Sequence, residues 1–213
     1  MSSDQKLATN WPINQVRRCL RKEDREGLVQ FLRERHEERF FRPIEHLMVA
    51  SGNVQGYGFA VMSLCALLIE TIQSYRDGLP TTFGPELDRL KKMRTIPAPY
   101  RIPPGLHVNG KEAFQRFFRA HSQEFSGLSG AGFYKSIRNG LLHQGQTKAG
   151  WTLTKYGAGV WDAKEKIIFR DAFAKQLQSA FREYLTDLRS RPWHHRLWTN
   201  AARKIWWLIR LSQ

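Results

Sequence analysis

The chain has 213 residues, of which 34 are lysine or arginine and 19 are aspartate or glutamate, giving a formal net charge of +15. A hydrophobic content of 41% is enough to build a core, which excludes a wholly disordered chain. The longest largely apolar run, residues 59–69, is shorter than the roughly 20 residues of a membrane-spanning helix. Two cysteines cannot form a disulfide framework or a four-cysteine zinc site.

The excess positive charge is concentrated in two windows. Residues 101–150 carry a net charge of +5 and residues 188–213 carry +6, so 11 of the 15 excess charges lie there. The rest of the chain is nearly balanced. A concentrated charge of this kind is typical of contact with a polyanion, either a nucleic acid or an anionic membrane surface.

Residues 14–50 are expected to be helical, because apolar residues recur at helical spacing among charges of both signs. Gly27 and Pro43 are the expected interruptions. The next helix should cover residues 59–77 and end at Gly78, and its apolar residues on all sides predict a central position. Glu70 follows its most apolar part and either needs a partner in the interior or lies at an exposed rim.

Residues 79–110 contain six of the nine prolines and predict a long connection with a short helix near residues 85–93, which could serve as a lid or bind a partner. Amphipathic helices are expected over residues 111–125 and 133–144, the second ending at Gly145. Residues 150–170 alternate β-forming residues with turns and predict a small hairpin-like insert of two or three strands.

A helix over residues 171–190 should follow, and then a basic tail with four of the seven tryptophans. Residues 189–211 form an amphipathic pattern that could lie on a membrane, bind RNA or dock on a partner. The pattern is equally typical of a helix packed on its own domain, which we favour because tryptophans in a small domain are mostly buried.

Together these elements predict a mainly α fold, a helical bundle with a small β insert. We divide the chain into an N-terminal helical extension (1–50), a central helical domain (51–190) and a C-terminal basic helix (191–213). The N-terminus shows no apolar segment of a secretory signal, so a cytoplasmic location is expected.

The segment 136–145 contains the residues best suited to chemistry, Arg138, Asn139 and His143. Asn139 and His143 share a helix face because they are four residues apart. A histidine can take or give a proton near neutral pH, and a guanidinium binds phosphate through paired hydrogen bonds. This trio suits cleavage of a phosphodiester without a metal. A histidine at this place also simply suits a helix C-terminus, where it interacts with the dipole.

The spacing of Arg138, Asn139 and His143 resembles the signature of the HEPN superfamily, in which an arginine and a polar residue are followed by three to five residues and a histidine. The resemblance covers about residues 55–190. It implies a helical bundle that dimerises and brings two motifs into one cleft. It further implies metal-independent RNA cleavage through the 2′-hydroxyl, without a cofactor, in a prokaryotic toxin–antitoxin or phage-defence context.

By this resemblance His143 is the general acid or base, Arg138 holds the scissile phosphate and Asn139 orients the site. We expect Glu70 to pair with Arg138, a point that rests on burial and not on the motif. Gly140 interrupts the motif helix and could allow close approach of a second helix at a dimer interface. The basic residues expected to contact RNA are Arg116, Arg119, Lys135 and Lys148.

Two other functions fit the sequence. Some HEPN domains lack activity, so the chain could be a non-catalytic RNA-binding or regulatory module. It could also dock on a membrane or a protein through residues 189–211, although a membrane is the less expected partner. The expected partners are therefore RNA, a second copy of the chain, and an antitoxin or other protein.

Overall fold

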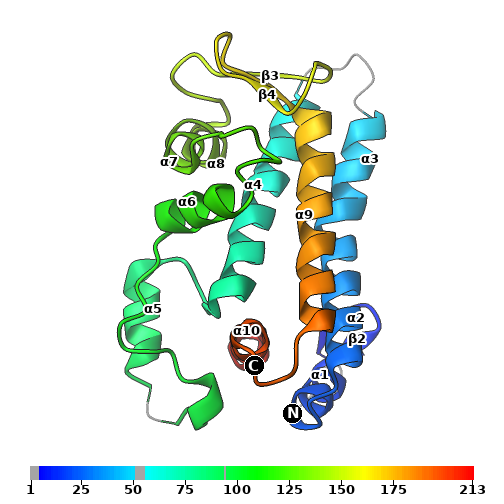
Figure 1. The fold of residues 1–213 in the computed structure, drawn as a ribbon, viewed down its shortest axis with the longest axis vertical. Helices are drawn as coiled ribbons and strands as arrows, with labels where there is room; N and C mark the ends of the chain where they lie inside the picture. The colour runs from blue at the N-terminus through cyan, green and yellow to red at the C-terminus, as the bar shows by residue number, and fades with distance from the viewer. Residues whose placement is uncertain (1–4, 51–55, 94) are drawn as a thin grey trace. The chain divides into compact units, whose positions relative to one another are not determined.

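The computed structural model describes residues 5–50, 56–93 and 95–213 and confirms a mainly α fold with two small sheets (Figure 1). The chain divides into two compact units. The first unit comprises Met1–Arg39, Ser74–His107 and Glu183–Gln213, and the second comprises Phe40–Gln73 and Val108–Arg182. The units therefore do not follow the linear division predicted from the sequence, whose boundary at residue 51 lies outside the described residues.

The first unit begins with a two-stranded antiparallel ribbon of β1 (Lys6–Ala8) and β2 (Trp11–Pro12), which the sequence did not predict. Helices α1 (Ile13–Arg21) and α2 (Arg25–His36) follow.

The expected interruption at Gly27 is wrong, because the chain breaks earlier, at Glu23, whose φ of 54° is left-handed. Asp24 caps α2 by accepting a hydrogen bond of 2.9 Å from the Gly27 amide. A Cβ on Gly27 would overlap that carboxylate, so the glycine serves the cap.

The second expected interruption, Pro43, lies inside a continuous helical stretch. A π-helical turn, η1 (Glu37–Phe41), precedes α3 (Arg42–Ala50), and Pro43 is the second residue of α3. Proline is tolerated in the first turn of a helix because the missing amide donor is not needed there. The proline thus marks a change of helix type and not a break.

The central apolar helix is α4 (Tyr57–Asp77), close to the predicted residues 59–77. Gly78 ends it as predicted, with a φ of 69° and with the Leu79 amide donating to the Ser74 carbonyl at 2.9 Å. Among the described residues α4 is long and apolar enough, by length and composition alone, to cross a membrane. Half of its apolar window is buried inside the structure, and a core helix passes the same test.

The proline-rich connection contains α5 (Gly84–Lys91) and a 3₁₀ turn, η2 (Ala98–Tyr100), and much of it packs on the C-terminal helix α10 (Arg196–Leu211). Tyr100 stacks on Trp206 with ring centroids 5.5 Å apart, and its carbonyl accepts a hydrogen bond of 3.1 Å from Trp207 Nε1. Lys204 Nζ donates to the Pro80 carbonyl at 2.8 Å.

Helix α10 is a core helix of the first unit. Trp198 and Trp207 are fully buried, and Ala201, Ile205 and Ile209 are buried with them. The packed-helix interpretation of the tail is therefore confirmed. Docking on a membrane or a partner through this apolar face would require the helix to leave the core.

The second unit contains α6 (Gly110–Ala120), α7 (Gly130–Phe133), a π-helical turn η3 (Tyr134–Arg138) and α8 (Asn139–Gln144). Helix α6 ends five residues before its predicted end, in a turn where Gly127 has a φ of 72°. The core of this unit is a cluster of buried aromatic rings from α6, α7, α9 and the turn after α6. Its members are Phe114, Phe117, Phe118, Phe125, Phe133 and Phe173.

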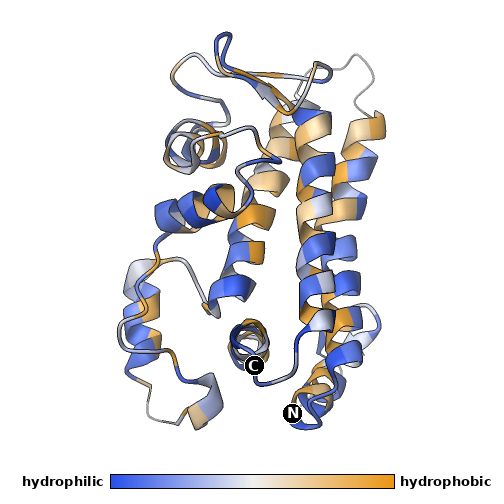
Figure 2. Cartoon of the chain, in the orientation of Figure 1, coloured by the Kyte–Doolittle hydropathy of each residue, from blue (hydrophilic) through white to orange (hydrophobic). Residues whose placement is uncertain are grey.

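The predicted β insert is present as a three-stranded sheet of β3 (Thr152–Thr154), β4 (Trp161–Asp162) and β5 (Ile167–Phe169). The strand order is β3-β5-β4, with β4 antiparallel and β3 parallel to β5, so only β4 and β5 form a hairpin. Helix α9 (Arg170–Ser190) follows and matches the predicted residues 171–190. Figure 2 shows polar and apolar stripes alternating along α9.

Candidate functional site

The predicted motif lies on two consecutive helical segments of the second unit. Arg138 is the last residue of the π-helical turn η3, and Asn139 and His143 belong to α8, which follows without a break. A π-helical turn inside a helix leaves a backbone carbonyl without its intrahelical hydrogen bond and rotates the side chains that follow it around the helix axis. Such turns are frequent at functional sites. Here the freed Ser136 carbonyl accepts a hydrogen bond of 2.8 Å from the Lys148 amide.

Arg138 is held from three directions. Its Nη2 lies 3.3 Å from the carboxylate of Glu70 on α4, in an ion pair whose side chains are 19% and 11% exposed. Its Nη1 donates to Asn139 Oδ1 at 3.1 Å, and its guanidinium lies 5.4 Å from the centre of the Tyr134 ring. The expected pairing of Glu70 with Arg138 is confirmed, and the guanidinium is fixed before any ligand binds.

Two residues that the sequence did not single out shape this cluster. Tyr134 precedes Arg138 by four residues, and this spacing on a helix could have predicted the contact of the ring with the guanidinium. Gly110 is the first residue of α6, and a Cβ there would lie 3.0 Å from both Glu70 Oε1 and Tyr134 Cε2. A glycine therefore lets α6 begin against the ion pair, which nothing in the sequence indicated.

His143 lies in the last turn of α8 and is exposed. Its imidazole makes no hydrogen bond or ion pair with another residue in the described parts of the chain. Gly145, with a φ of 65°, ends α8 as predicted, and its amide donates to the Leu141 carbonyl at 3.1 Å. The imidazole therefore has both ring nitrogens available to solvent, one helical turn from Asn139.

The role expected for Gly140 is corrected. Gly140 is buried, and a Cβ on it would overlap the Gln146 carbonyl oxygen and lie 3.3 Å from Thr147 Cα. The space beside the glycine is filled by the chain's own loop after α8, so Gly140 is not open to a second helix. The same loop brings Lys148 back to the motif helices.

The four basic residues expected to contact RNA fall into two places. Lys135 is exposed on η3, and Lys148 is half-buried on the loop beside Gly140, so both flank the motif. Arg116 and Arg119 are exposed on α6. Arg119 lines a pocket of about 260 Å³ beside the turn at residues 127–131, and neither Arg138 nor His143 lines it.

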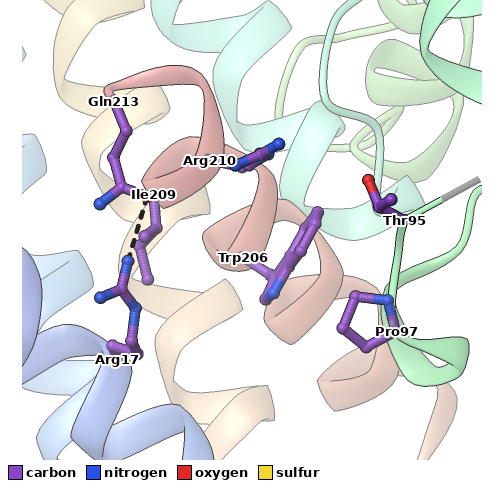
Figure 3. A pocket seen from close by; sticks show the side chains of 7 residues that line it. All are labelled: Arg17, Thr95, Pro97, Trp206, Ile209, Arg210 and Gln213. Atoms are coloured by element: carbon purple, nitrogen blue, oxygen red, sulfur yellow. Dashed lines mark hydrogen bonds between the residues drawn. The ribbon is translucent and has the colours of Figure 1, made fainter. Parts of the chain in front are cut away.

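The first unit has a separate pocket of about 440 Å³ beside the end of α10 (Figure 3). Thr95 and Pro97 lie across it from Trp206, and Arg17 lies on the other side, next to the end of the chain. Arg17 Nη2 donates to Gln213 Oε1 at 3.1 Å, and one face of Trp206 is covered by Tyr100. Arg17 and Trp206 are thus each already in contact with another residue of the first unit.

Comparisons of this chain with protein-family models, with curated proteins and with solved structures found no match. The assignment of function therefore depends on the geometry and chemistry of the residues themselves.

Proposed function

We propose that the chain is a metal-independent endoribonuclease of the HEPN type, acting through Arg138, Asn139 and His143. The observation that carries the proposal is a fixed guanidinium and an exposed imidazole on consecutive helical segments. Arg138 is held by Glu70 and Asn139, whereas His143, on the same helix face as Asn139, is exposed and makes no bond to another described residue.

The chemistry requires a proton acceptor for the RNA 2′-hydroxyl and a proton donor for the leaving 5′-oxygen. The 2′-oxygen attacks the phosphorus, the bond from phosphorus to the 5′-oxygen breaks, and a 2′,3′-cyclic phosphate forms. A histidine side chain can fill either proton-transfer role near neutral pH. Arg138 would stabilise the charge that develops on the phosphate oxygens, and its bond to Asn139 would keep it oriented.

One histidine cannot be both acid and base in the same step, so two copies of the motif suit the reaction better than one. A homodimer would supply the second His143 and the second Arg138. This arrangement is part of the HEPN resemblance. An antitoxin partner and a role in prokaryotic defence belong to the same proposal.

A polymeric substrate is favoured by exposure and charge. His143 and Lys135 are exposed, and the window 101–150 carries a net charge of +5. A polyanion that lies across an open surface can reach these side chains, and binding through phosphates would weaken steeply with added salt.

RNA binding without cleavage is the second candidate function. It is favoured by the same ion pair, because a guanidinium already bonded to Glu70 and Asn139 can serve the fold alone. The two candidates differ in a single outcome, which is whether substitution of His143 removes a cleavage activity.

The test measures cleavage of single-stranded RNA by the purified protein in EDTA. His143→Ala should lower the rate by at least about 100-fold, the contribution expected of a general acid or base. The matched control is His46→Ala, because His46 is also exposed and lies on α3 of the same unit.

Arg138→Ala should also abolish cleavage, and its thermal unfolding must be compared with that of the wild type because the substitution removes the ion pair between Arg138 and Glu70. Equal cleavage by the wild type and His143→Ala would disprove the catalytic proposal. Salt-dependent RNA binding in the absence of any cleavage would support the second candidate.

A further inference from the structure

A second cluster of basic side chains surrounds a pocket of about 510 Å³ in the first unit. The pocket lies at the first two turns of α10, which begins at Arg196. Its lining includes three basic residues of the tail, one hydroxyl, one acid and an apolar residue of the proline-rich connection. These are His194, Arg196, Arg203, Thr199, Asp77 and Leu106.

Arg203 is the unusual member of this lining, because it is only 8% exposed and has no acidic partner. Its one hydrogen bond is from Nη1 to Asn200 Oδ1 at 3.1 Å, and its buried Nε has no partner. No carboxylate in the described parts of the chain lies within ion-pair distance of it. A buried guanidinium without a counter-charge is costly, so its retention points to an anion that is supplied from outside the chain.

The surroundings of Arg203 hold it in place. Asn200, which accepts its hydrogen bond, is itself fixed by donating from Nδ2 to the Arg76 carbonyl at 2.6 Å. A Cβ on Gly78 would lie 2.6 Å from Arg203 Nη1 and 3.0 Å from Asn200 Cα, so only a glycine leaves room for this packing. The guanidinium thus occupies a built position and is not a surface side chain that happens to fold inward.

The charges around the pocket favour an anion. Arg196 and His194 are exposed at its rim, and they face the same space as Arg203, whereas Asp77 contributes one negative charge. The amide groups at the N-terminus of α10 add a partial positive charge at this end of the helix. Burial lowers the pKa of Arg203, because its charged form is partly withdrawn from water.

We propose that this pocket binds a phosphate monoester, with Arg203 and Arg196 as the groups that hold the phosphate. A doubly charged phosphate offers several acceptor oxygens, which matches two guanidiniums converging from positions seven residues apart on one helix face. The volume exceeds that of a bare phosphate and leaves room for the organic part of the ester. The site uses residues of the first unit only and does not depend on the ribonuclease proposal.

Calorimetric titration of the full chain with inorganic phosphate and with adenosine 5′-monophosphate tests the site. We expect saturable binding to the wild type and at least about tenfold weaker binding to Arg203→Met. Arg196→Ala should bind several-fold more weakly and keep the wild-type melting temperature, because Arg196 is exposed. The control Arg210→Ala, at the exposed far end of the same helix, should bind as the wild type does.

Thermal unfolding gives an independent readout. Phosphate should raise the melting temperature of the wild type and not that of Arg203→Met, and in phosphate-free buffer Arg203→Met should be at least as stable as the wild type. Should Arg203→Met fail to fold, the titration of Arg196→Ala decides. Wild-type affinity in Arg196→Ala and Arg203→Met, or no saturable binding to the wild type up to about 10 mM, would overturn the proposal.

The phosphate could belong to a free small molecule or to the 5′ end of an RNA. Competition with short oligoribonucleotides that carry either a 5′-phosphate or a 5′-hydroxyl separates the two. Displacement of adenosine 5′-monophosphate by the 5′-phosphorylated oligonucleotide alone identifies an RNA end as a ligand, and displacement by neither identifies a small phosphate ester. Equal displacement by both oligonucleotides would contradict recognition of a phosphate monoester.

Discussion

Each of the two basic windows, residues 101–150 and 188–213, contains one largely buried arginine, but the surroundings of the two differ. In the second unit Arg138 lies 3.3 Å from a carboxylate that α4 provides, and Asn139 and Tyr134 complete its surroundings. In the first unit Arg203 is more deeply buried, yet it bonds only to the amide of Asn200. The windows have nearly the same net charge, +5 and +6, so composition alone does not distinguish them.

The difference shows what an acidic partner does to a buried cation. Glu70 lowers the cost of burying Arg138 and fixes its direction, so the guanidinium is positioned without a ligand. Arg203 has its direction fixed by Asn200 and Gly78 but its charge left uncompensated. The first arrangement suits a residue that is already oriented when its substrate binds, and the second suits a residue whose charge is compensated only by an anion from outside the chain.

The largest effect is expected when the carboxylate that pairs with Arg138 is removed. Glu70→Gln should lower the free energy of unfolding by about 3 kcal/mol, because it leaves a largely buried guanidinium without its counter-charge. Urea unfolding at neutral pH measures the change. Glu45→Gln, an exposed glutamate on α3, is the control and should change stability by less than about 0.5 kcal/mol. A stability of Glu70→Gln equal to that of the control would show that the pair contributes nothing.

A second substitution tests the space around Arg203. Gly78→Ala should cost about 2 kcal/mol, because the backbone is left-handed there, with a φ of 69°, and the new Cβ would collide with Arg203 Nη1. Gly84→Ala is the matched control, since a Cβ at Gly84 meets no atom within 4 Å. Thermal or urea unfolding compares the two. If Gly78→Ala is as stable as Gly84→Ala, the close packing of Arg203 is not as described.

Lys204, the neighbour of Arg203 in the chain, provides a further test through the pH dependence of the free energy of unfolding. Burial lowers its pKa from 10.5 to about 8, so between pH 8 and about 10 the folded protein loses a proton that the unfolded chain keeps. The free energy of unfolding should therefore rise with pH in this window, by up to about 1.4 kcal/mol per pH unit.

The rise should be absent from Lys204→Met and present in Lys175→Met, whose lysine is exposed on α9. Unfolding curves of the three proteins at pH 7, 8, 9 and 10 measure it. Parallel pH dependence of the wild type and Lys204→Met would contradict a lowered pKa of the Lys204 amine.

Long periodic elements could be predicted from the sequence. Helices α4 and α9 match their predicted residues within two positions, because their apolar patterns extend over 21 residues each and Gly78 marks the end of the first. For Glu70 the sequence left two positions open, an interior one with a partner such as Arg138 and an exposed rim, and the structure shows the first. Glu70, Arg138 and Asn139 were all named as site residues from the sequence, and the structure places them in contact.

Other features depend on tertiary packing that no local pattern encodes. The π-helical turns η1 and η3 have ordinary helical sequences, so the sequence gives no sign of where the extra residue is accommodated. The burial of Arg203 depends on Gly78 and Asn200, which are more than 100 residues apart in the chain. The sequence of residues 189–211 predicts an amphipathic helix but not which of its basic residues is buried, and the proline-rich connection lines part of the pocket beside Arg203.

The central claim, that Arg138, Asn139 and His143 cleave RNA without a metal, is tested most directly by the ends of the product. Wild-type protein in EDTA should leave a 2′,3′-cyclic phosphate on single-stranded RNA, detectable by mass spectrometry, and should not cleave the same RNA with 2′-O-methyl groups. Cleavage of the methylated RNA, or cyclic-phosphate products formed equally by His143→Ala, would contradict the account.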